Sequence, residues 1–533
     1  MVPVTRAQPD PSLVGSCEQG TAGAILDVGN VRASIFNGGH LFFPNLSSVG
    51  YQIEESAGIN ASHSNSLIIG GFVDGELRTA GSTYGPWEFW PGPIPESGLP
   101  NDCLAYDRLY TVYERDIHPD ITPGAVVREW PVELGAPFWE IDDIPGYTPL
   151  TGDRPRMRGH QYIWWVDNDL GNLHDHSDSN PLGVEVINEA FAFDAIGDVG
   201  NMTFYRHTII NKSDSPIEEM YVGRFADVDL GDPWDDAIGS DSTLSLAYVY
   251  TLYESDGEYG TPPPAFGFAM LEVAISSDGV RRSLVPDGGQ FFSSVTGPRK
   301  SGLHGDPRSR EEKYNFLRGL WSDDGSPMRA SGRGYEGVGP RTKFIFHGDP
   351  VSGVGWSELN LDGNGTREGG YDKRVMGSYG PVLLNPGDSL SIAMAYIWVR
   401  GSNHLDSVTR LKAATRQLHE VKGALLAERR PPGPEFIDGN PPETPRHPFW
   451  VDEPYPNPAS DRLTLRASFD KSGPVHIRVV DALGRTRLSR TVVAAEAGQR
   501  DIPIEVSSLA PGTYSVSVES WSHRTAHTFV VLR

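Results

Sequence analysis

The chain has 533 residues, a formal net charge of −25 at pH 7 and 38% hydrophobic residues. This length exceeds what one ordinary core can organise, so two to four domains are expected. The negative charge argues against a nucleic-acid partner and against adsorption to anionic membranes, because both require a basic surface. No stretch reaches the ~18 consecutive apolar residues that span a bilayer, so no membrane span is expected.

The first 24 residues form an N-terminal segment without a clear strand or helix pattern. Its "TRAQ" followed by a Pro/Ser stretch looks like the tail of a signal peptide, although the apolar core of such a peptide is not present. The two cysteines of the chain are Cys17 and Cys103. They would pair in an oxidising compartment and close a long loop, or they are two unrelated buried thiols.

Residues 25–430 are expected to form a large β-rich domain, in one or two subdomains. Runs such as "VEVINEAFAFD", "MTFYRHTIIN" and "SLSIAMAYIWVRG" alternate apolar and polar residues or are continuously apolar, and turn residues end several of them. We predict one or two packed β-sandwiches with long loops. A single helix is predicted over residues 403–428, because Leu405, Val408, Leu411 and Leu418 recur on one face and Asn403 can cap the first turn.

Residues 431–454 are rich in proline and show neither helical nor strand periodicity, which predicts an extended linker. Residues 455–533 contain short alternating runs separated by turn residues, among them "DRLTLRASF", "VHIRVVD" and "GTYSVSVES". Six or seven strands at this spacing predict a small immunoglobulin-like β-sandwich. The fold class is therefore mainly β throughout.

Four blocks of this C-terminal region occur in a characteristic order: "YPNPASDRLTL", "VVDALGR", "VSSLAPGTYSVSV" and a terminal "FVVLR". They resemble the type A C-terminal sorting domain of the type IX secretion system. The resemblance implies a β-sandwich export signal that the outer-membrane secretion machinery recognises and that is usually cleaved. It also implies passage through the periplasm and outer membrane to the cell surface or the extracellular space.

The large region carries further blocks, including "DVGNVRASIFNGGHLFF" and "YGPVLLNPGDSLSIAMAYIWVRG". These are similar to blocks of large secreted proteins that carry the same sorting domain and have no established activity. This resemblance supports a secreted location and implies nothing about chemistry.

The segment "ADVDLGDPWDDAIGSD", residues 226–241, crowds carboxylates without any lysine or arginine among them. Neighbouring carboxylates repel one another, and a hard cation with six to eight oxygen ligands would turn that repulsion into binding. The spacing is not that of an EF-hand, so we predict a calcium site in a loop between strands, with a solvated acidic loop as the alternative. The candidate ligands are Asp227, Asp229, Asp232, Asp235, Asp236 and Asp241.

Two other segments could hold the same cation. "DNDLGNLHD" repeats the spacing of "DVDLGDPWD" sixty residues earlier, which makes Asp167 and Asp169 candidates for a duplicated loop or for one composite site. "LDGNGTREGG" offers Asp362 and Asn364 at alternating positions, although a polar hairpin tip is an equal interpretation. The pair His174 and His176 is a weaker candidate for a transition metal.

No motif of nucleophilic, zinc-dependent or phosphate-binding catalysis occurs in the chain. We therefore expect a non-catalytic secreted or cell-surface protein with a structural, adhesive or matrix-binding role, stabilised by Ca²⁺. Its partners would be the secretion machinery and a surface polysaccharide or a second copy. The alternative is a secreted polysaccharide-acting hydrolase or a carbohydrate-binding protein, with sugars stacked on exposed tryptophans. The candidates are Trp87, Trp90, Trp164 and Trp165, and their packing into a core is the competing interpretation.

Overall fold

The computed structural model divides the chain into two compact units, residues 1–431 and 432–533. It describes residues 10–429 and 450–531 apart from short segments. These segments are 44–48, 54–57, 86, 100–101, 119–120, 142–143, 196, 285–289, 297–304, 335–337, 371, 452–453, 455–458, 470–472, 482–484, 495–497 and 521–522. Most of the predicted linker, residues 431–454, lies outside the described residues. Each unit is considered by itself.

The larger unit contains a first antiparallel sheet, whose path through the described residues runs from β20 at one end to β5 at the other. In spatial order its strands are β20 (Gln290–Thr296), β21 (Lys373–Leu384), β15 (Ile217–Val228), β6 (Ser64–Val73), β3 (His40–Leu41), β2 (Val31–Phe36), β4 (Tyr51–Ile53) and β5 (Asn60–Ser62). Two further strands join it at the side, β1 (Gly23–Leu26) on β2 and β7 (Glu76–Ala80) on β6.

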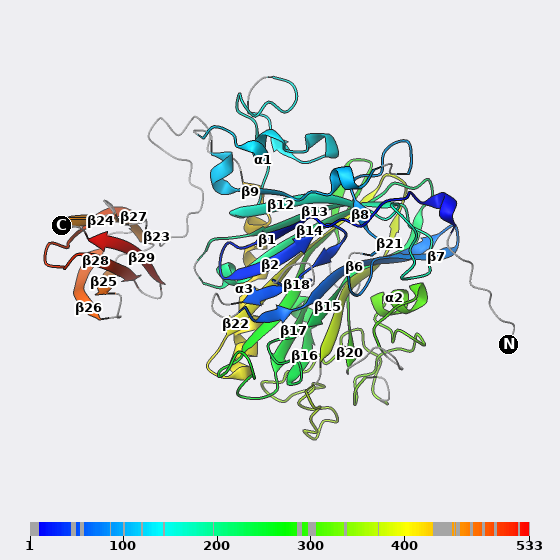
Figure 1. Cartoon of the computed structure of the whole chain (residues 1–533). Helices are drawn as coiled ribbons and strands as arrows, with labels where there is room; N and C mark the ends of the chain where they lie inside the picture. Colours follow the sequence, from blue (N-terminus) through cyan, green and yellow to red (C-terminus); the bar gives the residue numbers. More distant parts are fainter. Residues whose placement is uncertain are drawn as a thin grey trace. The chain divides into compact units, whose positions relative to one another are not determined.

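A second antiparallel sheet faces the first, and Figure 1 labels the longer strands of both. Its order is β16 (Asp236–Asp241), β17 (Leu246–Thr251), β18 (Pro264–Ser277), β22 (Ser389–Arg400), β14 (Met202–Asn211), β13 (Val184–Ala192), β12 (Gln161–Asn168) and β8 (Trp90–Pro91). β19 (Val280–Leu284) pairs with β18, β9 (Tyr110–Tyr113) pairs with β12, and β10 (Phe138–Trp139) with β11 (Arg154–Pro155) forms a separate ribbon.

The main core lies between the two sheets because alternate residues of their strands point inward. Leu67 and Val222 of the first sheet and Ile163, Trp165 and Ile392 of the second belong to this one apolar cluster. The predicted β-sandwich is therefore confirmed, as a single packed pair of sheets within the larger unit.

The outer faces of both sheets are covered by helices (Figure 1). α2 (Arg310–Leu317) buries Tyr314, Phe316 and Leu317 against the first sheet. α3 (His404–Leu425) begins where Asn403 accepts a hydrogen bond from the Asp406 N–H, and it contacts β18 and β22. The remaining helical turns are η1 (Pro11–Leu13), η2 (Leu104–Tyr106), η3 (Glu114–Ile117), α1 (Ala125–Arg128), η4 (Val132–Leu134), η5 (Asp198–Asn201) and η6 (Ser242–Leu244).

The predicted helix of residues 403–428 thus exists and ends three residues earlier. Its buried positions include Val408, Leu411 and Leu418, and Leu425 at its end packs against the same core, whereas Val421 is 38% exposed. Among the described residues, no helix has the length and apolar character required to cross a membrane.

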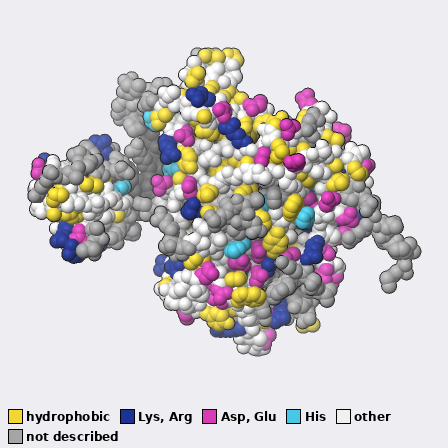
Figure 2. Space-filling view, viewed as in Figure 1, with side chains coloured by type: hydrophobic (Ala, Val, Ile, Leu, Met, Phe, Trp, Pro, Cys, Tyr) yellow, Lys and Arg dark blue, Asp and Glu magenta, His cyan; other side chains and the backbone are white. Residues whose placement is uncertain are grey.

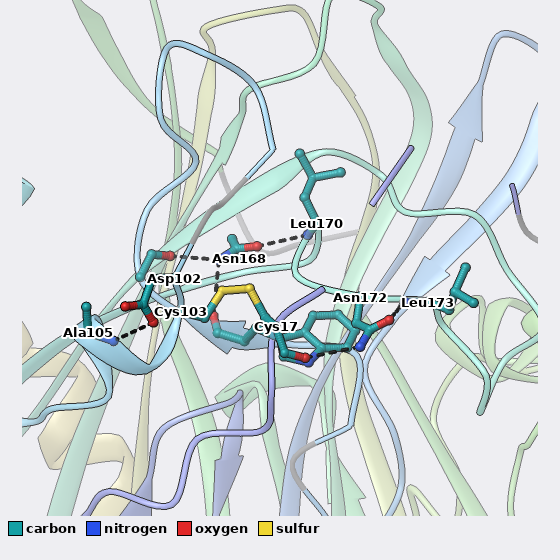
Figure 3. Close-up of a disulfide and its surroundings, with 10 residues drawn as sticks. Cys17, Asp102, Cys103, Ala105, Asn168, Leu170, Asn172 and Leu173 are labelled. Atoms are coloured by element: carbon teal, nitrogen blue, oxygen red, sulfur yellow. Dashed lines mark hydrogen bonds between the residues drawn. A yellow bond between two sulfur atoms is a disulfide. The ribbon is translucent and has the colours of Figure 1, made fainter. Parts of the chain in front are cut away.

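Cys17 and Cys103 form a disulfide that closes a separation of 86 residues (Figure 3). The bond is buried with Trp90 in a small apolar cluster. Beside it the Cys17 N–H donates to the Gly171 carbonyl at 2.8 Å, and Asn172 Nδ2 donates to the Cys17 carbonyl at 3.1 Å. The paired interpretation of the two cysteines is therefore the one that the structure shows.

The smaller unit contains two antiparallel sheets around one apolar core. One sheet consists of β23 (Trp450–Val451), β24 (Arg462–Phe469) and β27 (Gly498–Glu505). The other consists of β26 (Thr486–Ala494), β25 (Gly473–Asp481), β28 (Gly512–Ser520) and β29 (His523–Val531). Leu463, Leu465, Ile477, Val516 and Phe529 from both sheets are buried together, as the period-two alternation of their runs predicts.

Candidate functional site

Six aspartates gather where the adjoining ends of β15 and β21 in the first sheet meet β16 of the second. We call them the aspartate cluster: Asp227, Asp229, Asp235, Asp236, Asp306 and Asp372. β15 ends with Asp227 and Val228 beside the first residues of β21, in the register Asp227↔Arg374. This register places the acidic residues that follow β15 next to Asp372, which directly precedes β21.

Three members of the cluster are close enough to share one ion. Asp227, Asp229 and Asp372 each offer a carboxylate oxygen, and these oxygens all lie within 4.8 Å of one another. Two unit charges at that separation repel by roughly 3 kcal/mol at an effective dielectric constant near 20. The arrangement is therefore unfavourable unless a proton or a cation neutralises it.

Arg374 supplies one positive charge to this cluster. Its Nε lies 3.1 Å from Asp227 Oδ1 and 3.6 Å from Asp306 Oδ1, and its Nη1 lies 2.5 Å from Asp372 Oδ1. The same Nε donates to the Tyr84 hydroxyl at 2.9 Å. One guanidinium thus serves three carboxylates, which leaves the cluster with an excess of negative charge.

The other three aspartates have no lysine or arginine within ion-pair distance among the described residues. Asp229 lies 3.7 Å from His63 Nδ1, and Asp236 uses one oxygen to accept a hydrogen bond from the Leu230 N–H at 3.0 Å. Their remaining oxygens and that of Asp235 are buried without a hydrogen-bond donor. Asp236 is completely buried, so its free oxygen is shielded from solvent as well.

The electrostatics agree with the geometry. Burial, reinforced by the neighbouring carboxylates, raises the pKa of Asp227 and of Asp236 well above its ordinary value. Burial likewise raises the pKa of Asp229, and it raises the pKa of Asp235 to about 7 with the help of Asp256 and Asp232. At neutral pH the cluster either retains protons or binds a cation.

The remaining candidates in residues 226–241 have local partners outside the cluster. Asp232 Oδ1 accepts from the Trp234 N–H in a turn. Asp241 caps η6 by accepting from the Thr243 N–H at 3.1 Å, and it lies 3.8 Å from Lys412 Nζ. Both therefore shape the loop and the helical turn that surround the cluster.

Asp362 and Asn364 form a solvent-exposed turn. The Asp362 carboxylate accepts hydrogen bonds from the Asn364 N–H at 2.8 Å and from the Thr366 hydroxyl at 2.8 Å. These bonds favour its charged form and lower the pKa of Asp362 to about 2. The segment is thus a polar turn held by its own hydrogen bonds, without a strand directly before it among the described residues, and a cation at this turn stays a prediction.

Asp167 and Asp169 are fully buried and do not join the aspartate cluster. The Asp167 carboxylate accepts from the Gly38 and Gly39 N–H groups, from Trp165 Nε1 and from Asn188 Nδ2. Asp169 accepts from three consecutive N–H groups, those of residues 182–184, at 2.6 to 3.0 Å. Burial raises the pKa of Asp169, and that of Asp167 to about 7, while the donated hydrogen bonds act in the opposite direction.

The two histidines of this segment are engaged by other groups. His174 contacts the carbonyls of Thr79 and Asp169 through its two ring nitrogens, each at 2.8 Å. The His176 ring stacks on Trp87, with 5.2 Å between the ring centroids. The structure thus gives both rings a structural partner in place of a shared metal.

Three of the four tryptophans considered for sugar stacking are buried. Trp165 packs between the sheets, Trp164 packs on the outer face of the second sheet, and Trp90 packs against the disulfide. Trp87 is 42% exposed. Trp234 is exposed further, at 55%, and it stands in the loop of the aspartate cluster.

Sequence reasoning missed Asp306, Asp372 and Arg374 as members of the site. They lie far from residues 226–241 in the chain, and the pairing of β15 with β21 brings Asp372 and Arg374 beside Asp227. The signal in the sequence was one acidic residue followed by two basic residues in "YDKR", at the start of an apolar run. That signal shows a charged strand end and does not say which strand lies next to it.

Acidic side chains are common on the rest of the larger unit, where Figure 2 shows them spread over the visible face and interspersed with lysine and arginine. Exposed carboxylates of this kind are solvated and do not indicate a ligand. The aspartate cluster differs because its free oxygens are buried.

Comparison with known protein families identifies the C-terminal unit. Residues 453–532 match the family described as the secretion system C-terminal sorting domain. No curated protein matches the chain. A solved structure of a polysaccharide lyase aligns with 8% identity and a TM-score of 0.17, over 71% of this chain and 40% of that chain, so this chain spans less than half the length of that protein.

The family match agrees with the sorting-domain blocks in the sequence, including their order and their position at the end of the chain. The protein is accordingly a cargo of the type IX secretion system, which exports it across the outer membrane to the cell surface or the extracellular space.

Proposed function

We propose that the protein is a non-catalytic β-sandwich protein that acts at or beyond the cell surface and is stabilised by Ca²⁺ bound in the aspartate cluster. Its role would be structural, adhesive or matrix-binding. The observation that carries the proposal is the set of buried aspartate oxygens without donors around a single arginine.

Calcium fits these side chains better than other common ions. It takes six to eight oxygen ligands, tolerates irregular geometry and is not limited to a preformed octahedron as Mg²⁺ is. Asp227, Asp229 and Asp372 supply three carboxylates within reach of one ion. Water or an external oxygen donor would complete the coordination.

Export supports the same proposal. Extracellular modules often bind calcium with dissociation constants of about 10⁻⁴–10⁻³ M, which suits a medium with millimolar calcium. A cation that neutralises the cluster would then stabilise the sandwich at its site of action.

The test is a thermal melt of the full chain in EGTA, in millimolar CaCl₂ and in millimolar MgCl₂. With a Kd of about 10⁻⁴ M and about 10 mM calcium, the ion is at 100 Kd and binding adds about 2.7 kcal/mol, which corresponds to an increase in Tm of several degrees. The increase should be specific for calcium and absent from the variants Asp229→Asn and Asp372→Asn.

Asp362→Asn is the matched control because it removes one carboxylate from the other candidate loop. It should keep the full calcium shift. A calcium-dependent increase in Tm that survives in Asp229→Asn and disappears in Asp362→Asn would instead assign the ion to the turn at Asp362. The absence of any shift would sink the proposal.

Carbohydrate binding is the second candidate function, and the exposure of Trp234 beside the cluster favours it. Hydrolysis of a polysaccharide would require two carboxylates that face a substrate cleft with a water or a sugar carbon between them. The same aspartates would then be essential for turnover, so a reducing-sugar assay on the Asp229→Asn variant separates hydrolysis from binding.

A further inference from the structure

Two exposed aromatic side chains border the aspartate cluster. Trp234 is 55% exposed and directly precedes Asp235, and Tyr253 is 57% exposed and directly follows Leu252. The Leu252 N–H donates to the Asp235 carbonyl at 2.9 Å, so the two aromatic residues flank the same hydrogen bond of the β16–β17 hairpin. A single exposed aromatic residue is ordinary on a protein surface, so the feature that matters is that two of them are neighbours beside the cluster.

The backbone at Trp234 also touches the segment that leads to Asp372. A Cβ added to Gly370 would lie 2.3 Å from the Trp234 carbonyl oxygen and 2.5 Å from Asp235 Cα, so these segments are in close backbone contact. Gly370 is two residues from Asp372. Trp234 and Tyr253 therefore stand at the rim of the aspartate cluster.

An independent observation points to a ligand within the cluster itself. Asp236 is completely buried, and its Oδ1 has no donor among the described residues, although Asp229, Asp235 and Asp256 lie near enough to raise its pKa by repulsion. A buried carboxylate oxygen that faces other carboxylates and no cation is incomplete without a proton or a positively charged partner.

We infer that the rim binds a neutral carbohydrate, with Trp234 and Tyr253 stacked on its pyranose rings and two adjacent hydroxyl groups occupying open coordination positions of the calcium ion. This inference rests on the proposed calcium site. Three carboxylates leave at least three of the six to eight coordination positions of calcium for other oxygens. The aromatic faces supply apolar contact to the C–H face of a sugar.

Charge decides in favour of a neutral sugar over a uronate. The carboxylates of Asp227, Asp229, Asp306 and Asp372 with Arg374 carry a net charge of about −3 when ionised, so one Ca²⁺ leaves no positive surplus. Asp235 and Asp236 add further negative character. A polyanion would gain no local attraction and would be repelled by the net charge of −25 of the chain.

The test is calorimetric titration of the full chain, in millimolar calcium and in EGTA, with trigalacturonate as the acidic comparison and with three neutral trisaccharides, maltotriose, cellotriose and mannotriose. At least one of these trisaccharides should bind in calcium and not in EGTA. Trp234→Ala should raise its Kd at least about fivefold, because a stacking contact is worth on the order of 1 kcal/mol. Tyr253→Ala should weaken binding in the same direction.

Trp87→Ala is the matched control, since Trp87 is also exposed and its ring already stacks on His176. It should bind the trisaccharide with unchanged affinity. All three variants should keep the calcium-dependent increase in Tm, because none of these side chains is a ligand of the ion.

The outcomes separate this inference from the proposed function. If the melting shift is present and no trisaccharide binds, or if Trp234→Ala and Trp87→Ala behave alike, the carbohydrate site is refuted and the calcium site stands. Binding of trigalacturonate alone contradicts the neutral class of ligand, and equal binding in EGTA contradicts the role of calcium. If the melting shift is absent, the proposed function itself fails.

Discussion

Residues 167–175 and 227–235 have the same spacing of aspartates and glycine, but their carboxylates have different environments. Asp167 and Asp169 accept hydrogen bonds from backbone N–H groups and from the side chains of Trp165 and Asn188. Asp227 lies beside Arg374 and Asp229 lies beside His63, and the other neighbours of both are further carboxylates. The spacing of carboxylates in the sequence therefore does not define a cation site. What decides is whether the neighbouring strands supply hydrogen-bond donors to those carboxylates.

The difference can be expressed as two kinds of buried charge. The 167–171 segment is satisfied by fixed donors, so its carboxylates stabilise the fold as they stand. The aspartate cluster is incomplete and destabilises the fold until a proton or a cation arrives. Substitutions in the two regions should consequently have opposite signs in the absence of calcium.

The largest effect is expected from the disulfide that braces the 167–171 segment. Closing a separation of 86 residues is worth about 4.5 kcal/mol in the chain-entropy model. The double variant Cys17→Ser/Cys103→Ser should lose stability of this order in urea denaturation, with and without calcium. An unchanged denaturation midpoint would mean that the bond constrains little of the unfolded chain.

The next largest effect concerns Asp169. In Asp169→Ala, three consecutive buried N–H groups lose their acceptor, and we expect a loss of roughly 3 kcal/mol or more. The loss should be the same in EGTA and in calcium, as measured by urea denaturation. If calcium changes the loss of stability in Asp169→Ala, the 167–171 segment and the aspartate cluster are energetically coupled, and the distinction between them is wrong.

A smaller effect of opposite sign is expected at Asp236. Replacing this buried carboxylate by an amide in Asp236→Asn removes a charge that faces other carboxylates, so the variant should be more stable than the unmodified protein in EGTA by about 1–2 kcal/mol. It should gain less from calcium. Destabilisation in EGTA would show that the Asp236 carboxylate, like that of Asp169, stabilises the fold through its hydrogen bonds.

The smallest effect is a pH dependence that comes from Asp235. Its pKa in the folded protein is raised to about 7, above the value of an unfolded chain. A raised pKa contributes stability that is present at low pH and is lost as the pH rises through the folded value. In EGTA, the Tm should fall between pH 5 and pH 8, and Asp235→Asn should flatten this slope in a melt series.

Much of the fold follows from the sequence by itself. Period-two alternation and turn residues predicted the β-sandwich, the 3.6-residue stripe predicted α3, and Asn403 was identified as its cap. The order of the C-terminal blocks predicted the sorting domain that the family comparison confirms. These features are local in the chain, and local propensity and pattern are what a sequence displays directly.

The site required the tertiary structure. The six aspartates in residues 226–241 are visible in the sequence, yet only Asp227, Asp229, Asp235 and Asp236 join the cluster, and they are completed by Asp306, Asp372 and Arg374 from distant segments. Strand pairing between β15 and β21 decided that contact. The fate of Asp167 and Asp169 was decided in the same way, because their donors come from strands and loops that only the folded chain brings together.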